Sequence, residues 1–177
     1  DRSCGGDELG IKAVMSLKGD VDGMGDFIKN SEVTNSFAKY NFFARMTDYF
    51  FSVYASRKMQ GRNIYTVFAG GDDIFILGAW DEVIGFAKEL REDFVRFAAG
   101  SPLTISMGLV LTKPNKPINF VAHMAEEALE EAKAIEGKDA ITIFNETVKW
   151  KNYLNDNNLT AELLKLGEEK LTTALLY

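Results

Sequence analysis

The sequence lacks the features of several broad classes of protein. Its 177 residues include a single cysteine, Cys4, which can form neither an internal disulfide nor, without companion ligands, a zinc site. His123 is the single histidine, which argues against a histidine-rich metal site and against histidine-based catalysis. No run of about 18 apolar residues and no signal-peptide pattern is present. We therefore expect no membrane segment and no export, and we predict a cytoplasmic location.

An excess of positive charge is also absent. The chain has 20 Lys and Arg residues against 26 Asp and Glu residues, a net charge of −6. This balance argues against broad, charge-driven binding of nucleic acid, although it leaves room for a local basic groove. What is present, 46% hydrophobic and 26% charged residues, is typical of a globular protein. At this length the chain can form one main domain with a small appendage.

Apolar periodicity predicts alternating strands and helices. Strands are expected at 11–18, 63–69, 74–79, 103–111 and 140–144, and helices at 34–57, 82–98 and 119–136. From Glu146 the pattern is helical, with a further amphipathic helix near 160–176. The order β-α-β-β-α-β-α-β predicts an α+β fold, a ferredoxin-like βαββαβ core with an extra helix and strand and a C-terminal helical appendage. The polar, glycine-rich start at 1–9 is interpreted as a linker.

Two acidic clusters stand at the ends of predicted strands. Asp72 and Asp73 complete a Gly-Gly-Asp-Asp tetrad that turns the predicted hairpin, whereas Asp20 and Asp22 follow the first strand. In a ferredoxin-like topology the first strand lies beside the hairpin, which brings Asp20 close to Asp72 and Asp73. Clustered carboxylates repel one another unless cations neutralise them, and hard oxygen ligands suit the Mg²⁺ or Mn²⁺ ions used with nucleotide phosphates. The pattern predicts, in outline, a nucleotidyl-transfer site.

The interpretation for Asp20, Asp72 and Asp73 is a two-metal centre. One ion would activate an attacking hydroxyl, and the other would hold the triphosphate and stabilise the leaving pyrophosphate. Gly and Asp are also common turn residues, so the tetrad alone fits a plain hairpin equally well. The second acidic cluster at a neighbouring strand end favours the metal centre. Asp22 either caps the following helix or supports a metal ligand.

Other candidate residues carry weaker signals. Gly23 and Gly25 flank Met24 at a strand-to-helix passage, where glycines let backbone amides approach a phosphate, although they also fit a plain tight turn. Because Asp20 lies close by, the interpretation of these glycines as a phosphate-binding segment is favoured over a plain turn. Lys133 lies on an amphipathic helix, and the pattern alone favours a solvated side chain there. His123, on the same helix, is interpreted as a surface or packing residue.

Four motifs, in order, resemble the second palm domain of the large, polymerase-like subunit of type III CRISPR effector complexes. They occupy residues 19–25, 68–81, 104–108 and 125–133, and the Gly-Ala-Trp-Asp at 78–81 indicates the Csm (III-A) branch over the Cmr branch. The resemblance covers about residues 9–150. It divides the chain into a linker at 1–9, a palm domain with the Gly-Gly-Asp-Asp motif at 10–148, and the start of a C-terminal helical domain at 149–177.

The resemblance implies a palm that converts ATP into cyclic oligoadenylate when the complex binds target RNA. The site residues that it implies are Asp20, Asp72 and Asp73 for two Mg²⁺ or Mn²⁺ ions, with Asp72 and Asp73 as the catalytic pair, and Gly23, Met24, Gly25, Gly70, Gly71 and Lys133 for the ATP triphosphate. The family often has a Ser-Arg pair near the adenine, where this chain has Ala44 and Arg45, so a hydroxyl contact to the base is not expected.

The resemblance also implies partners. The family builds its active site across two palms, so the other palm of the same subunit is expected, with other effector subunits and, through them, guide and target RNA. No membrane partner is expected. The family's nuclease domain needs a His-Asp pair, and His123 stands in another context, so no nuclease activity is expected of this chain. The C-terminal helices, rich in leucine, are interpreted as a partner-binding surface.

Two other functions compete with this interpretation. A diguanylate cyclase shares the palm and a similar acidic turn but uses GTP, and it needs guanine-reading Asn and Asp residues after the first strand. Residues 22–40 contain no such run. The other alternative is a non-catalytic, nucleotide-binding palm inside a ribonucleoprotein, but a scaffold has little reason to keep three clustered carboxylates.

Overall fold

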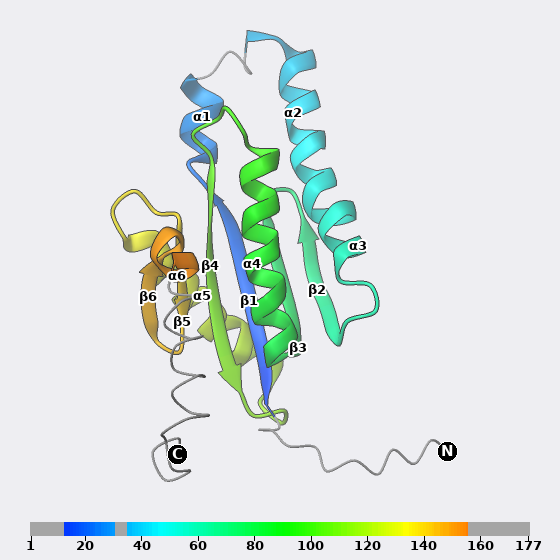
Figure 1. Cartoon of the computed structure of the whole chain (residues 1–177). Helices are drawn as coiled ribbons and strands as arrows, with labels where there is room; N and C mark the ends of the chain where they lie inside the picture. The colour runs from blue at the N-terminus through cyan, green and yellow to red at the C-terminus, as the bar shows by residue number, and fades with distance from the viewer. Residues whose placement is uncertain (1–12, 31–34, 156–177) are drawn as a thin grey trace.

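The computed structural model describes residues 13–30 and 35–155 (Figure 1). In chain order its elements are β1 (Val14–Asp22), α1 (Met24–Asn30), α2 (Phe37–Tyr49), the π-helical segment η2 (Phe50–Ala55), α3 (Ser56–Lys58), β2 (Ile64–Gly70), β3 (Asp73–Ala79), α4 (Trp80–Phe97), β4 (Thr104–Thr112), α5 (Ile118–Ala134), β5 (Ala140–Ile143), β6 (Glu146–Lys149) and α6 (Trp150–Asn155). The predicted linker at 1–9, the start of the first strand at 11–12 and the leucine-rich helix near 160–176 lie outside the described residues.

One mixed sheet runs through the described residues in the strand order β2-β3-β1-β4-β5-β6. Strand β1 lies between β3 and β4 and is antiparallel to both. This is the ferredoxin-like arrangement, in which two split βαβ units interleave. Helix α5 then carries the chain to β5, which pairs parallel with β4, and β6 pairs antiparallel with β5. The predicted α+β, ferredoxin-like palm is confirmed.

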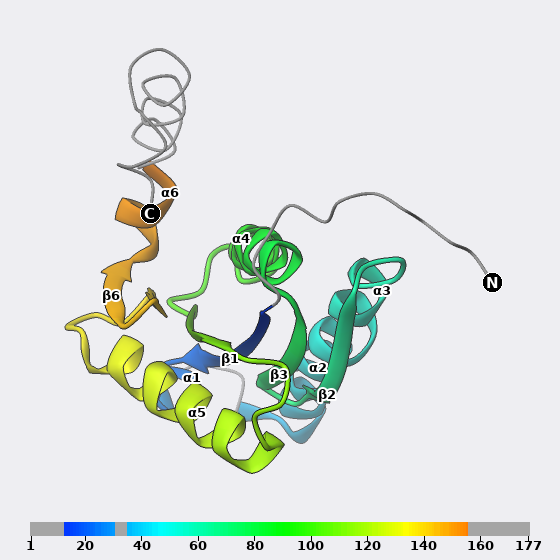
Figure 2. The same ribbon diagram turned by 90° about the horizontal axis from the view of Figure 1, so that it is seen from below.

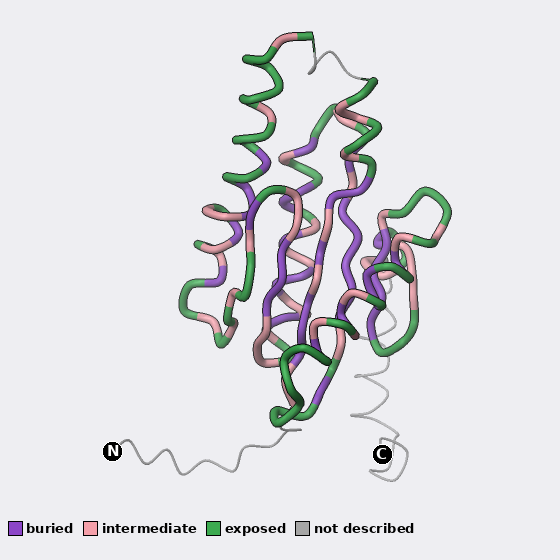
Figure 3. Tube along the Cα trace, turned by 180° about the vertical axis from the view of Figure 1, so that it is seen from behind, coloured by how far each residue is buried: buried purple, intermediate pink, exposed green. Residues whose placement is uncertain are grey.

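Helices cover both faces of the sheet (Figure 2). One face packs against α4 and the helical run from α2 to α3, and its core includes Met15 and Leu17 of β1 and Phe94 of α4, none more than 1% exposed. Residues alternate between faces along a strand, so Ser16, Lys18 and Asp20 point to the other side. Figure 3 shows the buried positions concentrated in the central strands.

Helix α5 lies on the opposite face from α4 and crosses β4 and β1 (Figure 2). The approach is close at Gly108, where a Cβ atom would lie 2.3 Å from the backbone nitrogen of Leu129. Only glycine fits that position without moving the helix. Because α5 packs on β4, β1 and β5, the face of β2 and β3 on this side stays open.

The structure corrects several predicted boundaries. The single helix predicted at 34–57 is a continuous helical run that contains a π-helical segment, and the short helix α1 precedes it. Strand β1 extends through Asp22, so both of its acidic residues lie inside the strand rather than after it. Hydrophobic periodicity places elements more reliably than it places their ends, because a frayed turn or an added strand pair changes few apolar positions.

The prediction of helix from Glu146 is wrong, since β6 begins there. Phe144 and Asn145 have φ values of +54° and +63°, the positive values that a two-residue hairpin loop of type I′ requires at both positions. Phenylalanine is unusual in that conformation, so no residue pattern at this point predicts a turn. A strand of four residues is also too short to show alternation.

The first residue of α6 belongs to the palm core. Trp150 is fully buried, and its indole N–H donates a hydrogen bond to the carbonyl oxygen of Ile105 at 3.0 Å. The division of the chain at 148 and 149 stays a prediction, but the packing joins Trp150 to the palm. Over the described residues, no helix combines the length and the apolar character needed to span a membrane.

Candidate active site

The Gly-Gly-Asp-Asp turn is a two-residue hairpin loop. Gly70 ends β2 opposite Asp73, the first residue of β3, which leaves Gly71 and Asp72 in the loop. Gly71 has a φ of +62°, the conformation that glycine supplies at the first loop position of a type II′ turn. The Gly71 amide donates to Asp48 Oδ1 at 2.9 Å. The carboxylate at the end of α2 therefore fixes the turn.

The end of β1 meets this turn. Asp20 and Asp73 are direct partners in the antiparallel register, and the Val21 amide donates to the Asp72 carbonyl oxygen at 3.1 Å. Directly opposed residues have Cβ atoms about 5 Å apart. The structure thus brings together Asp20, Asp72 and Asp73, as the topology predicted. Their role as metal ligands stays a prediction.

Burial and mutual repulsion disfavour the ionised forms of two of these carboxylates. Burial raises the pKa of Asp20, the charges of Asp72 and Asp22 add to the increase, and the ion pair with Lys133 opposes it. Burial likewise raises the pKa of Asp73, with further contributions from Asp20 and Asp72, while Lys18 opposes the increase. A bound divalent cation would reverse this balance by stabilising the ionised forms.

Lys133 points into the site. From the last turn of α5 its ammonium group hydrogen bonds Asp20 Oδ2, and both side chains are about a quarter exposed. The pattern-based view of Lys133 as a solvated residue is therefore wrong. Its predicted contact with a phosphate is untested, but its position beside Asp20 leaves it within the reach of any anion held there.

The carboxylates have the right chemistry for a hard cation, although their side chains do not converge on one point. Within 13–30 and 35–155, no group of three or more His, Cys, Asp or Glu side chains is close enough together to hold a metal ion as it stands. The donor set, carboxylate oxygens on adjoining strand ends, is the kind that Mg²⁺ and Mn²⁺ use. Burial is the main cause of the raised pKa values of Asp20 and Asp73, the neighbouring acids add to it, and a bound cation would oppose both effects.

Asp22 has a structural role. It is 3% exposed, and its Oδ2 atom accepts hydrogen bonds from Thr104 Oγ1 at 2.9 Å, Ser106 Oγ at 2.8 Å and the Asp139 amide at 3.2 Å. Asp139 in turn pairs with Arg91 on α4. These bonds join the end of β1 to β4 and to the segment before β5. The alternative that Asp22 caps the following helix is wrong.

A small pocket lies between α1, α2 and the hairpin turn. We call it the turn pocket; its volume is about 180 Å³, and it is lined by Met24, Ile28, Tyr40, Phe43, Ala44, Thr47, Gly71 and Asp72. An apolar cavity with a carboxylate and a turn backbone at one end suits a base with its phosphates toward the acids. Ala44 lies in this wall, where the resemblance implies contact with the adenine.

The residues predicted to follow the triphosphate are dispersed around the turn pocket. Met24 and Gly71 line it, whereas Gly23, with a φ of +74°, lines a neighbouring pocket with Asp26 and other residues. Gly25 is exposed in the first turn of α1. Gly70 is buried, and a Cβ atom there would lie 3.2 Å from Asp48 Oδ1. Contact of these backbones with phosphate stays a prediction.

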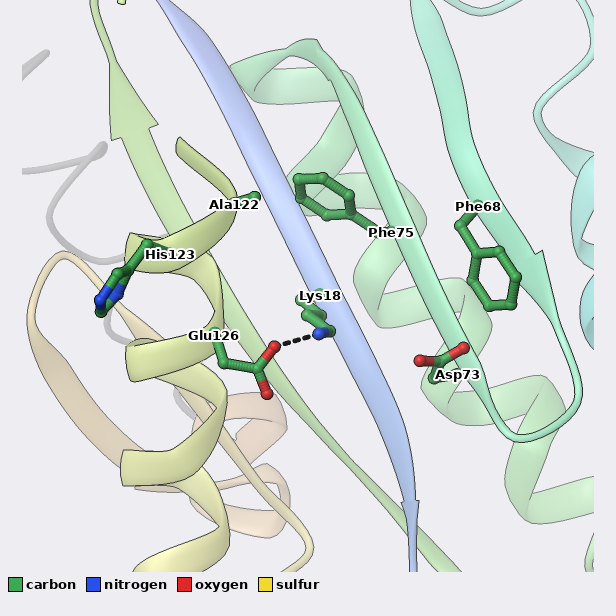
Figure 4. A pocket seen from close by; sticks show the side chains of 7 residues that line it. All are labelled: Lys18, Phe68, Asp73, Phe75, Ala122, His123 and Glu126. Carbon is green, nitrogen blue, oxygen red and sulfur yellow. Dashed lines mark hydrogen bonds and ion pairs between the residues drawn. The ribbon is translucent and has the colours of Figure 1, made fainter. Parts of the chain in front are cut away.

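A larger pocket opens on the α5 face (Figure 4). We call it the sheet pocket; its volume is about 630 Å³, and it is lined by Lys18, Phe68, Asp73, Phe75, Ala122, His123 and Glu126. Lys18 forms an ion pair with Glu126 across its wall. His123, interpreted from sequence as a surface or packing residue, is exposed at its border.

Sequence reasoning missed three residues of this site, Lys18, Asp48 and Glu126. Their contacts join segments that are 23 or more positions apart, and no single-sequence pattern reports such pairs. One signal was available for Lys18. It lies two positions before Asp20 in a strand, so alternation places both on the same face.

Comparison with known proteins identifies the family. The model of the family described as Cas10/Cmr2, second palm domain, matches residues 13–142. The chain belongs to this family. The resemblance inferred from the four motifs is confirmed, including the III-A branch, which the relatives below share.

Relatives and solved structures agree with this assignment. The "CRISPR system single-strand-specific deoxyribonuclease Cas10/Csm1 (subtype III-A)" of Streptococcus thermophilus is 33% identical over 151 residues, covering 82% of this chain and 20% of that protein. The Csm1–Csm4 cassette in complex with cA3 has a TM-score of 0.75 at 28% identity, covering 81% of this chain and 24% of that one. The cassette in complex with one ATP has a TM-score of 0.73 at 29% identity, covering 79% of this chain and 23% of that one. The chain spans about a fifth of the length of the curated relatives it matches.

Proposed function

We propose that this chain is the ATP-binding palm of the large subunit of a type III-A CRISPR effector complex, and that it makes cyclic oligoadenylate from ATP by two-metal nucleotidyl transfer. The observation that carries the proposal is the meeting of Asp20, Asp72 and Asp73 at the adjoining ends of β1 and β3. The relatives support it, because similar Csm1–Csm4 cassettes have been solved with ATP, with pppApA and with cA3 and cA4.

In this mechanism Asp20, Asp72 and Asp73 would hold two Mg²⁺ or Mn²⁺ ions. Bound there, the ions supply activation of the attacking ribose hydroxyl and stabilisation of the departing pyrophosphate. Asp48 holds the turn in place by accepting a hydrogen bond from the Gly71 amide, so the backbone that carries the Asp72 side chain is fixed in position. Asp22 does the same for the end of β1 through β4.

Lys133 has a part in binding the substrate. Its ammonium group is paired with Asp20 in this structure. From its place beside Asp20, this ammonium group would bind the triphosphate, to which a lysine binds as a point charge. The turn pocket holds the adenine between α1 and α2, with the phosphates directed past Gly71 toward the acids. No hydroxyl at Ala44 reads the base.

The partners follow from the same family. We propose that the other palm of the subunit completes the site, that a Csm4-type subunit and other effector subunits assemble with it in the cytoplasm, and that guide and target RNA act through them. Helix α2 supports such contacts, because Phe37 and Phe42 are 82% and 68% exposed, as expected of a surface that another protein covers.

The test is nucleotide selection by the full-length subunit in its effector complex. ATP or GTP would be titrated by calorimetry in Mn²⁺ and in EDTA, and cyclic products would be measured with and without target RNA. Metal-dependent binding that favours ATP, with RNA-triggered cyclic oligoadenylate, is the expected result. A preference for GTP would support a diguanylate cyclase instead, and ATP binding without any product would support a nucleotide-binding structural palm.

A further inference from the structure

The segment between α5 and β5 has an unusual backbone. Gly137, Lys138 and Asp139 have φ values of +73°, +48° and +52°, so three successive residues adopt the left-handed conformation. Residues other than glycine rarely adopt it, and they persist there only where the surrounding structure holds them in place. We call residues 136–139 the α5–β5 turn. The contacts of this turn show which parts of the molecule its strained backbone connects.

Asp139 uses each of its polar groups in one of these contacts. Its carboxylate accepts two hydrogen bonds from the guanidinium group of Arg91 on α4, at 2.8 Å and 2.9 Å. Its carbonyl oxygen accepts a hydrogen bond from the Trp150 amide at 2.9 Å. Its own amide donates to Asp22 Oδ2 at 3.2 Å. Asp139 therefore joins α4, the start of α6 and the end of β1.

The end of β1 is the part of the chain that carries Asp20. Asp22 lies two residues further along the strand, so it is on the same face as Asp20. Its Oδ2 atom also accepts a hydrogen bond from Ser106, which is the register partner of Asp20 on β4. The amide of Ala140, next to Asp139, donates to the same serine hydroxyl at 3.4 Å. The position of Asp139 thus determines the hydrogen bonds that fix β1 at Asp20.

The α5–β5 turn also fixes the end of the helix that carries Lys133. Lys133 lies in the last turn of α5, immediately before the α5–β5 turn. From β6, the ammonium group of Lys149 donates hydrogen bonds to two carbonyl oxygens of the turn. The turn is therefore connected to both members of the Lys133–Asp20 ion pair, to the lysine through α5 and to the aspartate through Asp22.

We propose that Asp139, held by Arg91, is a positioning residue of the active site. It keeps Asp20 and Lys133 in the relative position in which they would bind the metal ions and the triphosphate. The Asp139 carboxylate does not contact the substrate, and acts by fixing its own amide against Asp22. The inference rests on the part of the proposed function that places metal ions at Asp20, and it adds a residue that holds this ligand in place.

The experiment removes the Arg91–Asp139 pair but keeps the Asp139 amide. Asp139→Gly together with Arg91→Met removes both charges and suits the left-handed backbone. The full-length subunit would be tested in its effector complex with target RNA, where kcat for cyclic oligoadenylate is expected to fall roughly tenfold. The Mn²⁺ concentration for half-maximal binding of an ATP analogue, with a methylene bridge between its α- and β-phosphates, is expected to rise by a similar factor in calorimetry. The thermal midpoint of the subunit is expected to stay close to the wild-type value.

Two further variants serve as controls. Asp139→Asn keeps an oxygen that can accept from Arg91 and tolerates the left-handed backbone, so it is expected to recover most of the wild-type activity. Arg62→Met together with Glu89→Gln removes another ion pair of α4, which joins this helix to the segment before β2 rather than to β1. This variant is expected to keep the wild-type kcat and the wild-type Mn²⁺ requirement.

The outcomes separate this inference from the proposed function. If the variant without the Arg91–Asp139 pair keeps the wild-type kcat and Mn²⁺ requirement per folded molecule, Asp139 serves only the fold and the inference alone is overturned. A wild-type complex that neither binds the analogue with Mn²⁺ nor makes oligoadenylate would overturn both. If the wild type binds the analogue with Mn²⁺ but makes no product, the proposed synthesis is wrong, and a raised Mn²⁺ requirement in the variant would still support the inference.

Discussion

The two faces of the sheet differ sharply, although the same strands form both. Along β1, Met15 and Leu17 face α4 and are fully buried, whereas Lys18 and Asp20 face α5 beside an open pocket. The α4 face is closed by a cluster of aromatic rings from η2 and α4, whose centroids lie 4.9–6.2 Å apart. The alternation of a single strand thus separates the residues that stabilise the fold from those that carry the chemistry.

The largest expected effect is at the hairpin turn, where Asp73 lines the sheet pocket on the α5 side and Asp72 lines the turn pocket. Replacing Asp72→Ala together with Asp73→Ala should abolish oligoadenylate synthesis by the full complex, a loss of roughly a thousandfold or more, because the metal ions supply several kcal/mol of charge stabilisation. The thermal midpoint should stay the same or rise, since repelling charges are removed. Cyclic products and circular dichroism melting would be measured on the same preparations. An unfolded double variant, or unchanged synthesis, would contradict the assignment.

The matching change on the α4 side should do the reverse. Leu90 of α4 is fully buried in the core, so Leu90→Ala should lower the free energy of unfolding by about 2–5 kcal/mol. Urea denaturation would measure this loss, and the folded fraction should keep the wild-type kcat. A lowered kcat in fully folded protein would show that the two faces are coupled rather than separate. Val95→Ala, at a 46% exposed position of the same helix, is the control and should change stability little.

A variant of Lys133 would test whether this paired charge on the α5 side contributes to ATP binding rather than to the stability of the fold. Lys133→Met should raise the KM for ATP roughly 10- to 100-fold through loss of a charge-assisted contact, with little effect on adenosine binding. The free energy of unfolding should change little, because the Lys133–Asp20 pair is about a quarter exposed. Lys113→Met, at an exposed loop position, serves as the control. Equal losses for ATP and adenosine would remove Lys133 from the phosphate site.

Asp22 is an exception to this separation of the two faces. It lies on the same face of β1 as Lys18 and Asp20, yet its hydrogen bonds hold the strands together. Asp22→Asn should cost about 1–3 kcal/mol of stability, since the amide nitrogen would be buried where Oδ1 already has no hydrogen-bond partner. Chemical denaturation would measure the loss, with Asp26→Asn on the exposed surface of α1 as the control. Loss of activity without loss of stability would instead place Asp22 at the metal ions.

The smallest expected effect concerns the edge of the α4 face, where Lys58 of α3 pairs with Asp93 of α4. The hydrogen bond to Asp93 raises the pKa of Lys58 above its ordinary value of 10.5. A raised lysine pKa contributes stability that is complete below the unfolded-state value and is lost as the pH rises through the folded-state value. The melting difference between wild type and Lys58→Met should therefore shrink as the pH rises beyond 10.5. A difference that stays constant with pH would exclude this pair as its source.

Much of this molecule could be predicted from its sequence, because the decisive signals are local. Apolar alternation places β1, the hairpin and β4, and the order of elements then determines which strands are neighbours. That is enough to bring Asp20 to Asp72 and Asp73. A helix was expected after the first strand, but the bounds of α1 and the whole of strand β6 escaped prediction, since seven and four residues are too few to establish a period, and Phe144 in a left-handed turn breaks the usual turn chemistry.

By itself the sequence determined the fold class, the family and the meeting of the acids, because each follows from residues that are close along the chain or from the strand order that they imply. Only the tertiary structure decided what surrounds the acids. The Lys133–Asp20 and Lys18–Glu126 pairs join residues 113 and 108 positions apart, and the closure of α5 onto Gly108 depends on contact between backbones. Such contacts form between segments that are far apart along the chain, and no periodic pattern in one sequence reports which of these segments meet.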